Sequence, residues 1–407
     1  MHKLLGSVLL LAPLALAQPY DLLLTGGHVI DPANNIDAVM DVAVSGSQIA
    51  RVAANIPRSE ARKAVDVSGL YVTPGLIDLH AHVYGYSGAI FPDDTQLVTG
   101  TTTVVDAGGS GWRTFDDFKA RIIDKSQTRV LVFINIVGHG MVPPWESDPD
   151  DMDPEKTAAK MKEYPNLIVG IKTAHFGRPG WTAIDRAVEA GRLSGKPVIV
   201  DSGILTPTGR NSRDELLDHL RPGDLRTHTY NDRQVTLVDR FSGRVEEYIR
   251  QARRRGLLFD MGHGAGSFLW PVATRAMAQG FPPDTISTDL HSASIMVPQS
   301  DMPNCITKLM SLGMTLEDAI ARSTVNPARA IHRFPELGTL SPGHTADISV
   351  FALRTGVFAL KDAWDKKRMA SRKLECVLTV RNGKIAFDQD GLSCPLWTTA
   401  GDYNRIP

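Results

Sequence analysis

Two histidines close the stretch YVTPGLIDLHAH, which ends at residue 82. Successive side chains of a β-strand point to opposite faces, so His80 and His82 project the same way, roughly 6 to 7 Å apart. This spacing lets two imidazoles bind one metal ion. Pro74 and Gly75 supply a turn before the strand, and the apolar residues after them suit a strand buried on both faces. Two ordinary histidines at a strand end remain the alternative unless further ligands are found.

Charged and imidazole side chains also end other apolar segments. Burying a charge without a partner is costly, so these residues need an explanation. They are Lys172, Asp201, His228, His263 and Asp289. Histidine and carboxylate are ligands that Zn²⁺ accepts readily, and Mn²⁺ or Fe²⁺ with other preferences. If the segments close into a barrel in chain order, all these side chains point to one rim and predict a metal site there.

Lys172 is the unusual member, because a protonated ammonium cannot bind a cation. A neutral lysine amine can react with carbon dioxide to give a carbamate, an anionic ligand that can bridge two metal ions. A buried ion pair of Lys172 with Asp201 or Asp289 explains the same pattern, and the residues alone do not separate the two explanations.

The segments that must position these residues alternate in a βα rhythm between residues 74 and 332. The expected strands read GLIDLHAH, TTTVVDAGG, RVLVFINIV, LIVGIKTAH, KPVIVDSG, DLRTHTY, LLFDMGHG and TISTDLH, with helices such as AAKMKEY and TAIDRAVEAGRLSG between them. Eight such units fit an α/β fold, a (β/α)8 TIM barrel of ~250 residues, whose chemistry lies at the carboxyl ends of the strands.

Both chain ends carry short β-like segments separated by turn residues. Residues 18–73 contain DLLLTGGHVID, DVAVSGSQIARVA and AVDVSGLYVTP, and residues 333–407 contain ADISVFAL and CVLTVRNGKIAF. The last segment turns at Asn382-Gly383, a dipeptide typical of hairpins. The similar character of the two ends predicts a small β-sandwich domain built from both, beside the barrel.

The composition is that of an ordinary globular protein. Of the 407 residues 43% are hydrophobic, which is enough for a barrel and a smaller domain. The formal net charge of -1 gives no electrostatic case for nucleic acid or an anionic membrane as a partner. We expect a small-molecule substrate, and a homo-oligomer stays possible on these data.

The chain begins with features of an export signal. A short basic start precedes the apolar run 4–16, and Ala15 and Ala17 fit the small-x-small cleavage pattern, so residues 1–17 are interpreted as a signal peptide. An uncleaved anchor is the alternative, but the run is shorter than the ~20 residues of a spanning helix. We expect an exported protein, periplasmic or extracellular, with no stable membrane anchor after cleavage.

Five motifs together resemble the amidohydrolase superfamily of metal-dependent hydrolases, and within it the dihydroorotase-like deacetylase subgroup. They are YVTPGLIDLHAH, GIKTAH, RTHTYN, FDMGHGAGSF and ISTDLH. The resemblance covers nearly the whole mature chain, including the split β-domain. HxH alone is weakly specific, whereas the ordered set that ends in the aspartate of the last motif is strongly specific.

The resemblance implies that the protein binds one or two divalent metal ions, with Zn²⁺ as the preferred ion, and it also implies which residues bind them. His80 and His82 would hold the more buried ion together with Asp289. Lys172, as a carbamate made with carbon dioxide, would bridge to a second ion, which His228 would also bind.

The fifth strand departs from the family pattern. The family normally supplies another histidine there, whereas this chain has Asp201 in VIVDSG. A carboxylate can bind metal through oxygen, which favours a harder ion or lowers the net charge of the site. Alternatively, the second ion is weakly held and the enzyme works with one. We expect that Asp201 binds metal.

The resemblance also implies a mechanism in which metal-activated water is the nucleophile. Asp289 would accept the proton of this water and pass it to the leaving group. His263 and His291 lie at or just beyond the last strand ends, where substrate contacts are expected, and His263 is the stronger catalytic candidate because glycines surround it. Tyr230 and Asn231 could hydrogen-bond a substrate carbonyl or carboxylate.

Three further features carry weaker expectations. Arg178, in the loop after the fourth strand, could pair with an anionic substrate. His139 and His175 could support a ligand from behind. The acidic segment 146–155 is either a solvated crossover or a lid over the site.

The preferred function is hydrolysis of an amide or ester bond in a small acylated amino acid or hydroxy acid. A cyclic amidase acting on a dihydroorotate-like or hydantoin-like ring is the alternative enzyme. An inactive barrel that serves as a binding or scaffold protein is the alternative from another class, which the Asp201 substitution keeps open.

Overall fold

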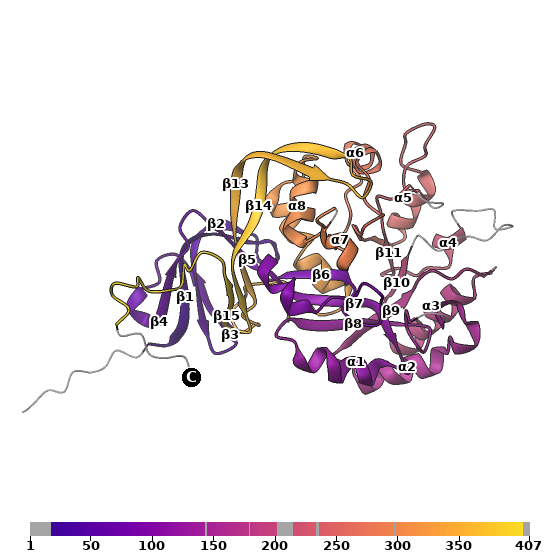
Figure 1. Cartoon of the computed structure of the whole chain (residues 1–407), viewed down its shortest axis with the longest axis horizontal. Coiled ribbons are helices and arrows are strands. Elements are labelled where there is room, and N and C mark those ends of the chain that lie inside the picture. The colour runs from indigo at the N-terminus through magenta and orange to yellow at the C-terminus, as the bar shows by residue number, and fades with distance from the viewer. Residues whose placement is uncertain are drawn as a thin grey trace, which may run out of the picture.

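The computed structural model describes residues 18–142, 145–178, 180–201, 215–232, 236–296 and 298–401. The predicted signal peptide at 1–17 lies outside the described residues. Two sheets lie side by side, one from the middle of the chain and one from its two ends (Figure 1). Among the helices of the described part, none is long and apolar enough to cross a membrane.

The central sheet consists of seven parallel strands, hydrogen-bonded to one another in chain order. They are β6 Leu76–Ala81, β7 Thr101–Gly111, β8 Arg129–Asn135, β9 Ile168–Thr173, β10 Val198–Asp201, β11 Leu225–Thr227 and β12 Leu258–Phe259. Six of them lie within a predicted barrel segment, and β7 begins with its predicted segment and extends two residues beyond it. Their nearly continuous burial follows from runs of valine, isoleucine and leucine that pack on both faces of a parallel sheet.

The eighth predicted strand is not a regular strand. Single parallel bridges join Thr285 to Asp260 and Leu290 to Ala81, so the segment fills the gap between β12 and β6. The main-chain N–H of His82 also donates to the carbonyl of Leu290 at 3.0 Å. Between the two bridges, Asp289 has a φ of +48°, which is not a strand conformation. The closed ring is consistent with a (β/α)8 barrel.

Short helices surround this sheet, and two of them fall on the predicted segments. The helices are α1 Phe115–Arg121, α2 Pro154–Glu163, α3 Thr182–Ser194, α4 Glu215–Asp218, α5 Glu247–Arg254, α6 Trp270–Ala278, α7 Ser292–Met296, α8 Met302–Met310, α9 Leu316–Ala321 and α10 Val325–Ala330. The predicted helices correspond to α2 and α3. Asp153 caps α2 by accepting from the N–H of Lys156, and Gly195 ends α3 in the left-handed conformation.

The second sheet has eight strands, in the order β15-β14-β13-β5-β1-β2-β3 with β4 also on β1. They are β1 Tyr20–Asp31, β2 Ile36–Ser45, β3 Gln48–Ala53, β4 Ala61–Asp66, β5 Tyr71–Pro74, β13 Ile348–Lys361, β14 Lys367–Arg381 and β15 Lys384–Asp388. Asn382 and Gly383 turn the chain between β14 and β15 with φ of +53° and +78°. Both chain ends therefore form one β-domain, but its strands are linked into a single branched mixed sheet and not into the two sheets of the predicted sandwich.

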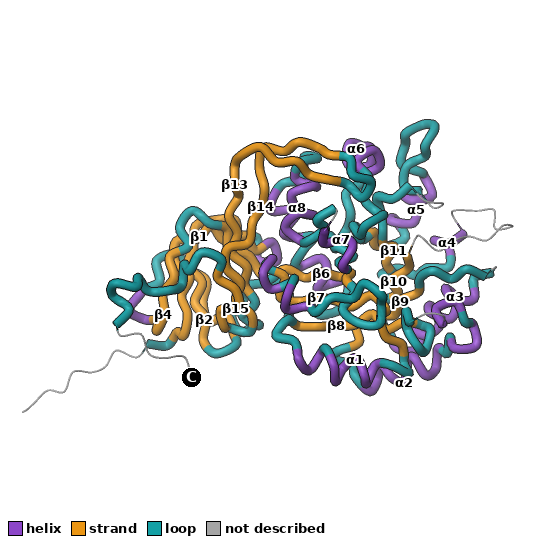
Figure 2. The backbone as a smooth tube through the Cα atoms, in the orientation of Figure 1, coloured by secondary structure: helices purple, strands orange, loops and turns teal. Residues whose placement is uncertain are grey.

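The long hairpin of β13 and β14 extends from this sheet to the barrel (Figure 2). The N–H of Leu374 donates to the hydroxyl of Thr307 on α8 at 3.0 Å. Asp362 accepts from the N–H of Trp270 on α6 at 3.3 Å. Part of the predicted C-terminal segment of the β-domain thus packs on the barrel and fixes the two parts to each other.

Candidate metal centre

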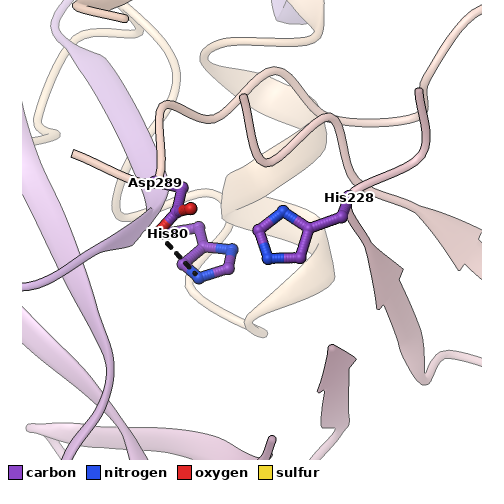
Figure 3. A group of neighbouring side chains, drawn as sticks. All are labelled: His80, His228 and Asp289. Carbon is purple, nitrogen blue, oxygen red and sulfur yellow. Dashed lines mark ion pairs between the residues drawn. The ribbon is translucent and has the colours of Figure 1, made fainter. Parts of the chain in front are cut away.

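Three predicted ligands converge at the carboxyl ends of the barrel strands. His80 lies on β6, His228 directly follows β11, and Asp289 lies on the segment that closes the ring. One ligand atom from each lies within 4.8 Å of the others, and Figure 3 shows the three side chains around a common point. Residues spread over two hundred positions thus meet because the sheet curls.

His82 and Lys172 complete this deep side of the site. His82 Nε2 lies 2.9 Å and His80 Nε2 lies 3.5 Å from Asp289 Oδ1. Lys172 Nζ lies 3.2 Å from His80 Nε2, and both side chains are buried. Ligands bound to Zn²⁺ at about 2.0–2.2 Å in a tetrahedral shell stand roughly 3.3 Å apart, which is close to both distances to Asp289 Oδ1, although His82 itself stands outside the compact group of three.

Asp201 lies on the other side of His228, at the end of β10. Its Oδ2 is 3.3 Å from His228 Nε2 and 3.4 Å from His175 Nε2. His175 comes from the loop after β9, and its Nδ1 lies 2.9 Å from Glu146 Oε1. The structure therefore brings two further residues to the centre. They are His175, which the sequence predicted only as a support for a ligand, and Glu146 of the acidic segment 146–155.

Hydrogen bonds behind the imidazoles determine which ring nitrogen faces the site. Thr227 Oγ1 donates to Asp260 Oδ2 at 2.7 Å, so it can only accept from His80 Nδ1, which lies 2.9 Å away. His228 Nδ1 lies 2.7 Å from the carbonyl of Gly262 and must donate to it. In their neutral forms, both rings then point an Nε2 lone pair at a neighbouring carboxylate.

A lone pair that faces a carboxylate requires a proton or a cation between the two atoms. Protonating His80 beside the ammonium of Lys172 would gather like charges in a buried space, which is costly. Burial alone would lower the pKa of His228, but the neighbouring Asp201 outweighs it and raises this pKa. A divalent cation satisfies the nitrogen and oxygen donors together without this repulsion. The donor set thus fits the metal that the sequence predicts.

Burial and neighbouring charges also shift the pKa values of the side chains in the site. Burial lowers the pKa of His80 well below its ordinary value, and the charge of Lys172 lowers it further. Burial alone would raise the pKa of Asp289, but the nearby His80, His82 and His228 outweigh it and hold the carboxyl ionised. Asp201 likewise has a pKa well below its usual range, because His228, Lys172 and His175 outweigh the effect of burial.

Three buried carboxylates, none of them predicted from the sequence, lie behind the deep side. Asp260 accepts from the hydroxyls of Thr227, Thr285 and Ser287. Asp106 accepts from three main-chain N–H groups. Burial raises the pKa of Asp78 to about 7. The available signal was an aspartate inside an apolar strand, as in GLIDLHAH, TVVDAGG and LLFDMGHG.

A cavity of about 300 Å³ opens onto the centre. Asp201, Asp289 and His228 form part of its wall, and His291, a predicted substrate contact, lines it as well. Tyr86, which the sequence analysis did not select, stacks on His82 with ring centroids 4.5 Å apart. The cavity is therefore polar at the centre and aromatic on one side.

Other predicted substrate contacts lie away from the cavity. The ring of His263 is fully buried and stacks on Phe268, and its Nε2 lies 2.8 Å from Lys308 Nζ. Gly262 and Gly264, with φ of +45° and +51°, turn this ring inward, so the glycines that made it a catalytic candidate direct it away from the cavity. His263 thus has no direct contact with the cavity.

Tyr230 is also fully buried, and its hydroxyl donates to the carbonyl of Phe281 at 3.3 Å. Asn231 donates through its side-chain amide to the carbonyl of His228 at 2.5 Å and so holds the backbone of this predicted ligand. Arg178 is exposed on the loop after β9 and is not among the residues that line the cavity. Among the predicted substrate contacts, only His291 lines it.

Comparison with known proteins decides the family. A deacetylase from Agrobacterium fabrum is 32% identical over 327 residues, which cover 77% of this chain and 78% of the relative. The chain belongs to the amidohydrolase superfamily, in its dihydroorotase-like deacetylase subgroup. The sequence profile of the Amidohydrolase family itself matches residues 270–386 of this amidohydrolase.

Solved structures agree with this assignment. A crystal structure of an adenine deaminase superimposes with a TM-score of 0.82 at 27% identity, over 90% of this chain and 99% of that one. A crystal structure of a dihydroorotase gives a TM-score of 0.79 at 27% identity with the same coverage. This amidohydrolase is thus an enzyme that hydrolyses C–N bonds, in a family that typically depends on divalent metal.

Proposed function

We propose that this amidohydrolase removes the acyl group from a small N-acylated amino acid or O-acylated hydroxy acid. The observation that carries the proposal is the convergence of His80, His228 and Asp289 at the carboxyl ends of the barrel strands, beside a polar cavity. The relative that is 32% identical is named a deacetylase, which supports an acyclic substrate.

The residues suggest how metal would be held. His80, His82 and Asp289 would bind the deeper ion. His228 and Asp201 would bind the outer one, and Lys172 as a carbamate would bridge the two. The nitrogen-rich donor set favours Zn²⁺. Bound divalent ions supply a Lewis acid and lower the pKa of water toward neutrality.

The side chains of the enzyme would then position groups and move a proton. Asp289 Oδ1 is ionised and lies beside His82 and His80, where it can accept a proton from the attacking water. The same carboxyl can then deliver this proton to the leaving amine or alkoxide. Tyr86 and His291, in edge-to-face contact at 5.4 Å, form a wall that can orient the acyl acid.

The size of the cavity also favours a compact substrate. About 300 Å³ is at the small end of ligand pockets, so an acetyl amino acid fits better than a peptide. Arg178 on the neighbouring loop is proposed to attract the free carboxylate of the substrate during entry. Reaction on the exported side of a membrane remains a prediction from residues 1–17.

Hydrolysis of a dihydroorotate-like or hydantoin-like ring is the second candidate. It is supported by the dihydroorotase structure that covers 90% of this chain. Both substrate types place an amide carbonyl beside a carboxylate or a second carbonyl, so the metal centre alone does not separate them.

A substrate screen at known metal content separates the candidates. The enzyme would be loaded with Zn²⁺ and assayed with both enantiomers of N-acetyl amino acids and O-acetyl hydroxy acids, and with dihydroorotate, a hydantoin and adenine. We expect the highest kcat/KM with an acyclic acetyl substrate. Faster turnover of a ring would replace the deacetylase by the cyclic amidase. Metal content well below one ion per chain, without turnover, would favour the scaffold protein.

A further inference from the structure

We propose that His175 is a ligand of the outer metal ion and, together with Asp201, takes the place of the imidazole that the family pattern has on the fifth strand. The inference rests on the proposed metal-dependent function. It concerns a loop residue that lies three positions after Lys172 and outside every barrel strand.

The first argument is the position of its inner nitrogen. His175 Nε2 lies 3.4 Å from Asp201 Oδ2, and His228 Nε2 lies 3.3 Å from the same oxygen. Both distances match the roughly 3.3 Å between neighbouring ligands of one zinc ion. All three side chains line the same cavity.

The second argument is the partner of its outer nitrogen. Metal-binding histidines usually donate their other ring N–H to an oxygen, which fixes the ring and leaves the inner lone pair free for the ion. His80 and His228 do so through Thr227 and the carbonyl of Gly262. His175 has the same arrangement, with Glu146 Oε1 2.9 Å from its Nδ1.

The third argument is the way the loop is held. His175 has a φ of +50°, a left-handed conformation that costs a residue with a side chain of order 1 kcal/mol and needs support from its surroundings. Ser147 supplies it, because its hydroxyl donates to the carbonyl of His175 at 3.2 Å and accepts from the N–H of Gly177 at 3.3 Å. The acidic segment thus holds the ring against Asp201.

His175 stands outside the compact group of His80, His228 and Asp289. Its side chain is 42% exposed, whereas those of Asp201 and His228 are only 5% and 6% exposed. The outer ion would therefore be held by two buried ligands and one ligand at the mouth of the cavity. We expect it to exchange faster than the deep ion.

The test is metal content and affinity, measured by mass spectrometry and by competition with a chromophoric chelator. Wild type loaded with Zn²⁺ should hold two ions. His175→Ala should keep the deep ion and weaken the outer site at least 10-fold, so that the content falls toward one. His175→Gln is a second variant of similar size. His28→Ala is the matched control, because His28 is a similarly exposed histidine that also pairs with a carboxylate, Asp37, but lies on β1 of the β-domain and does not line the cavity.

A double variant makes the test specific. Asp201→His returns the imidazole to the fifth strand, so Asp201→His with His175→Ala should regain the second ion. Two ions with unchanged affinity in both His175 variants would overturn the inference and leave the proposed function intact. One tightly bound ion in active wild type would also overturn it, whereas no stoichiometric metal and no turnover would defeat the proposed function itself.

Discussion

The deep half of the proposed metal centre, assigned to His80, His82 and Asp289, differs in its surroundings from the proposed outer half, assigned to His175, Asp201 and His228. The deep ligands are buried, and Asp78, Asp106 and Asp260 lie behind them. The outer half includes a partly exposed histidine supported by a loop carboxylate. The barrel thus preorganises one half, while the other depends on two loops packing together.

The strongest test of this difference is Asp289→Asn. The amide cannot accept a proton, so we expect kcat to fall roughly 10³-fold while the fold and most of the bound metal are retained. Steady-state kinetics on protein of measured metal content checks this. Asp201→Asn is the matched change in the outer half and should cost less activity. Appreciable remaining kcat in Asp289→Asn would remove this residue from proton transfer.

Asp260→Asn tests the carboxylates that lie behind the deep half. An amide cannot accept from all three hydroxyls, so Thr227 would turn and His80 would lose its fixed tautomer. We expect affinity for the deep ion to fall roughly 10- to 100-fold. Chelator competition measures it. Glu146→Gln is the equivalent change behind His175 and should weaken only the outer ion; equal losses at both sites would contradict the division into halves.

The smallest expected effect concerns Lys308, which contacts His263 behind the deep half. The His263 turn packs on Asp289, because a Cβ added to Gly264 would lie 2.2 Å from Asp289 Oδ2. Burial lowers the pKa of Lys308 from 10.5 to about 8. Between these values the unfolded chain binds a proton that the folded protein has released, so stability rises with pH, by roughly 3 kcal/mol at most.

Lys308→Met should remove that rise. The measurement is the free energy of unfolding at pH 8 and pH 10 for wild type and variant, compared with Lys384→Met, which changes an exposed lysine. A wild-type stability that changes with pH as it does in Lys308→Met would show that Lys308 keeps its proton in the fold.

The positions of the barrel strands and the direction of their side chains were predictable, because both depend on the pattern of residues within a short stretch of sequence. Alternation along a strand made His80 and His82 face the same way, and apolar runs located seven barrel strands. The eighth was predicted as a strand from its composition, but a positive φ at Asp289 and a hydrogen bond from the Thr288 hydroxyl to Asp78 interrupt the pairing. His263 and Tyr230 were misplaced because sequence does not show which way a turn directs a side chain.

The sequence by itself determined the types of the candidate ligands, their order along the chain and the presence of an aspartate, Asp201, at the end of the fifth strand. Only the tertiary structure decided that His175 lies beside that aspartate. It also decided that three buried carboxylates lie behind the deep half. The physical reason is that strand geometry sets the direction of a side chain within a few residues, whereas the meeting of the loop after β9 with the segment around Glu146 depends on packing between elements distant in sequence.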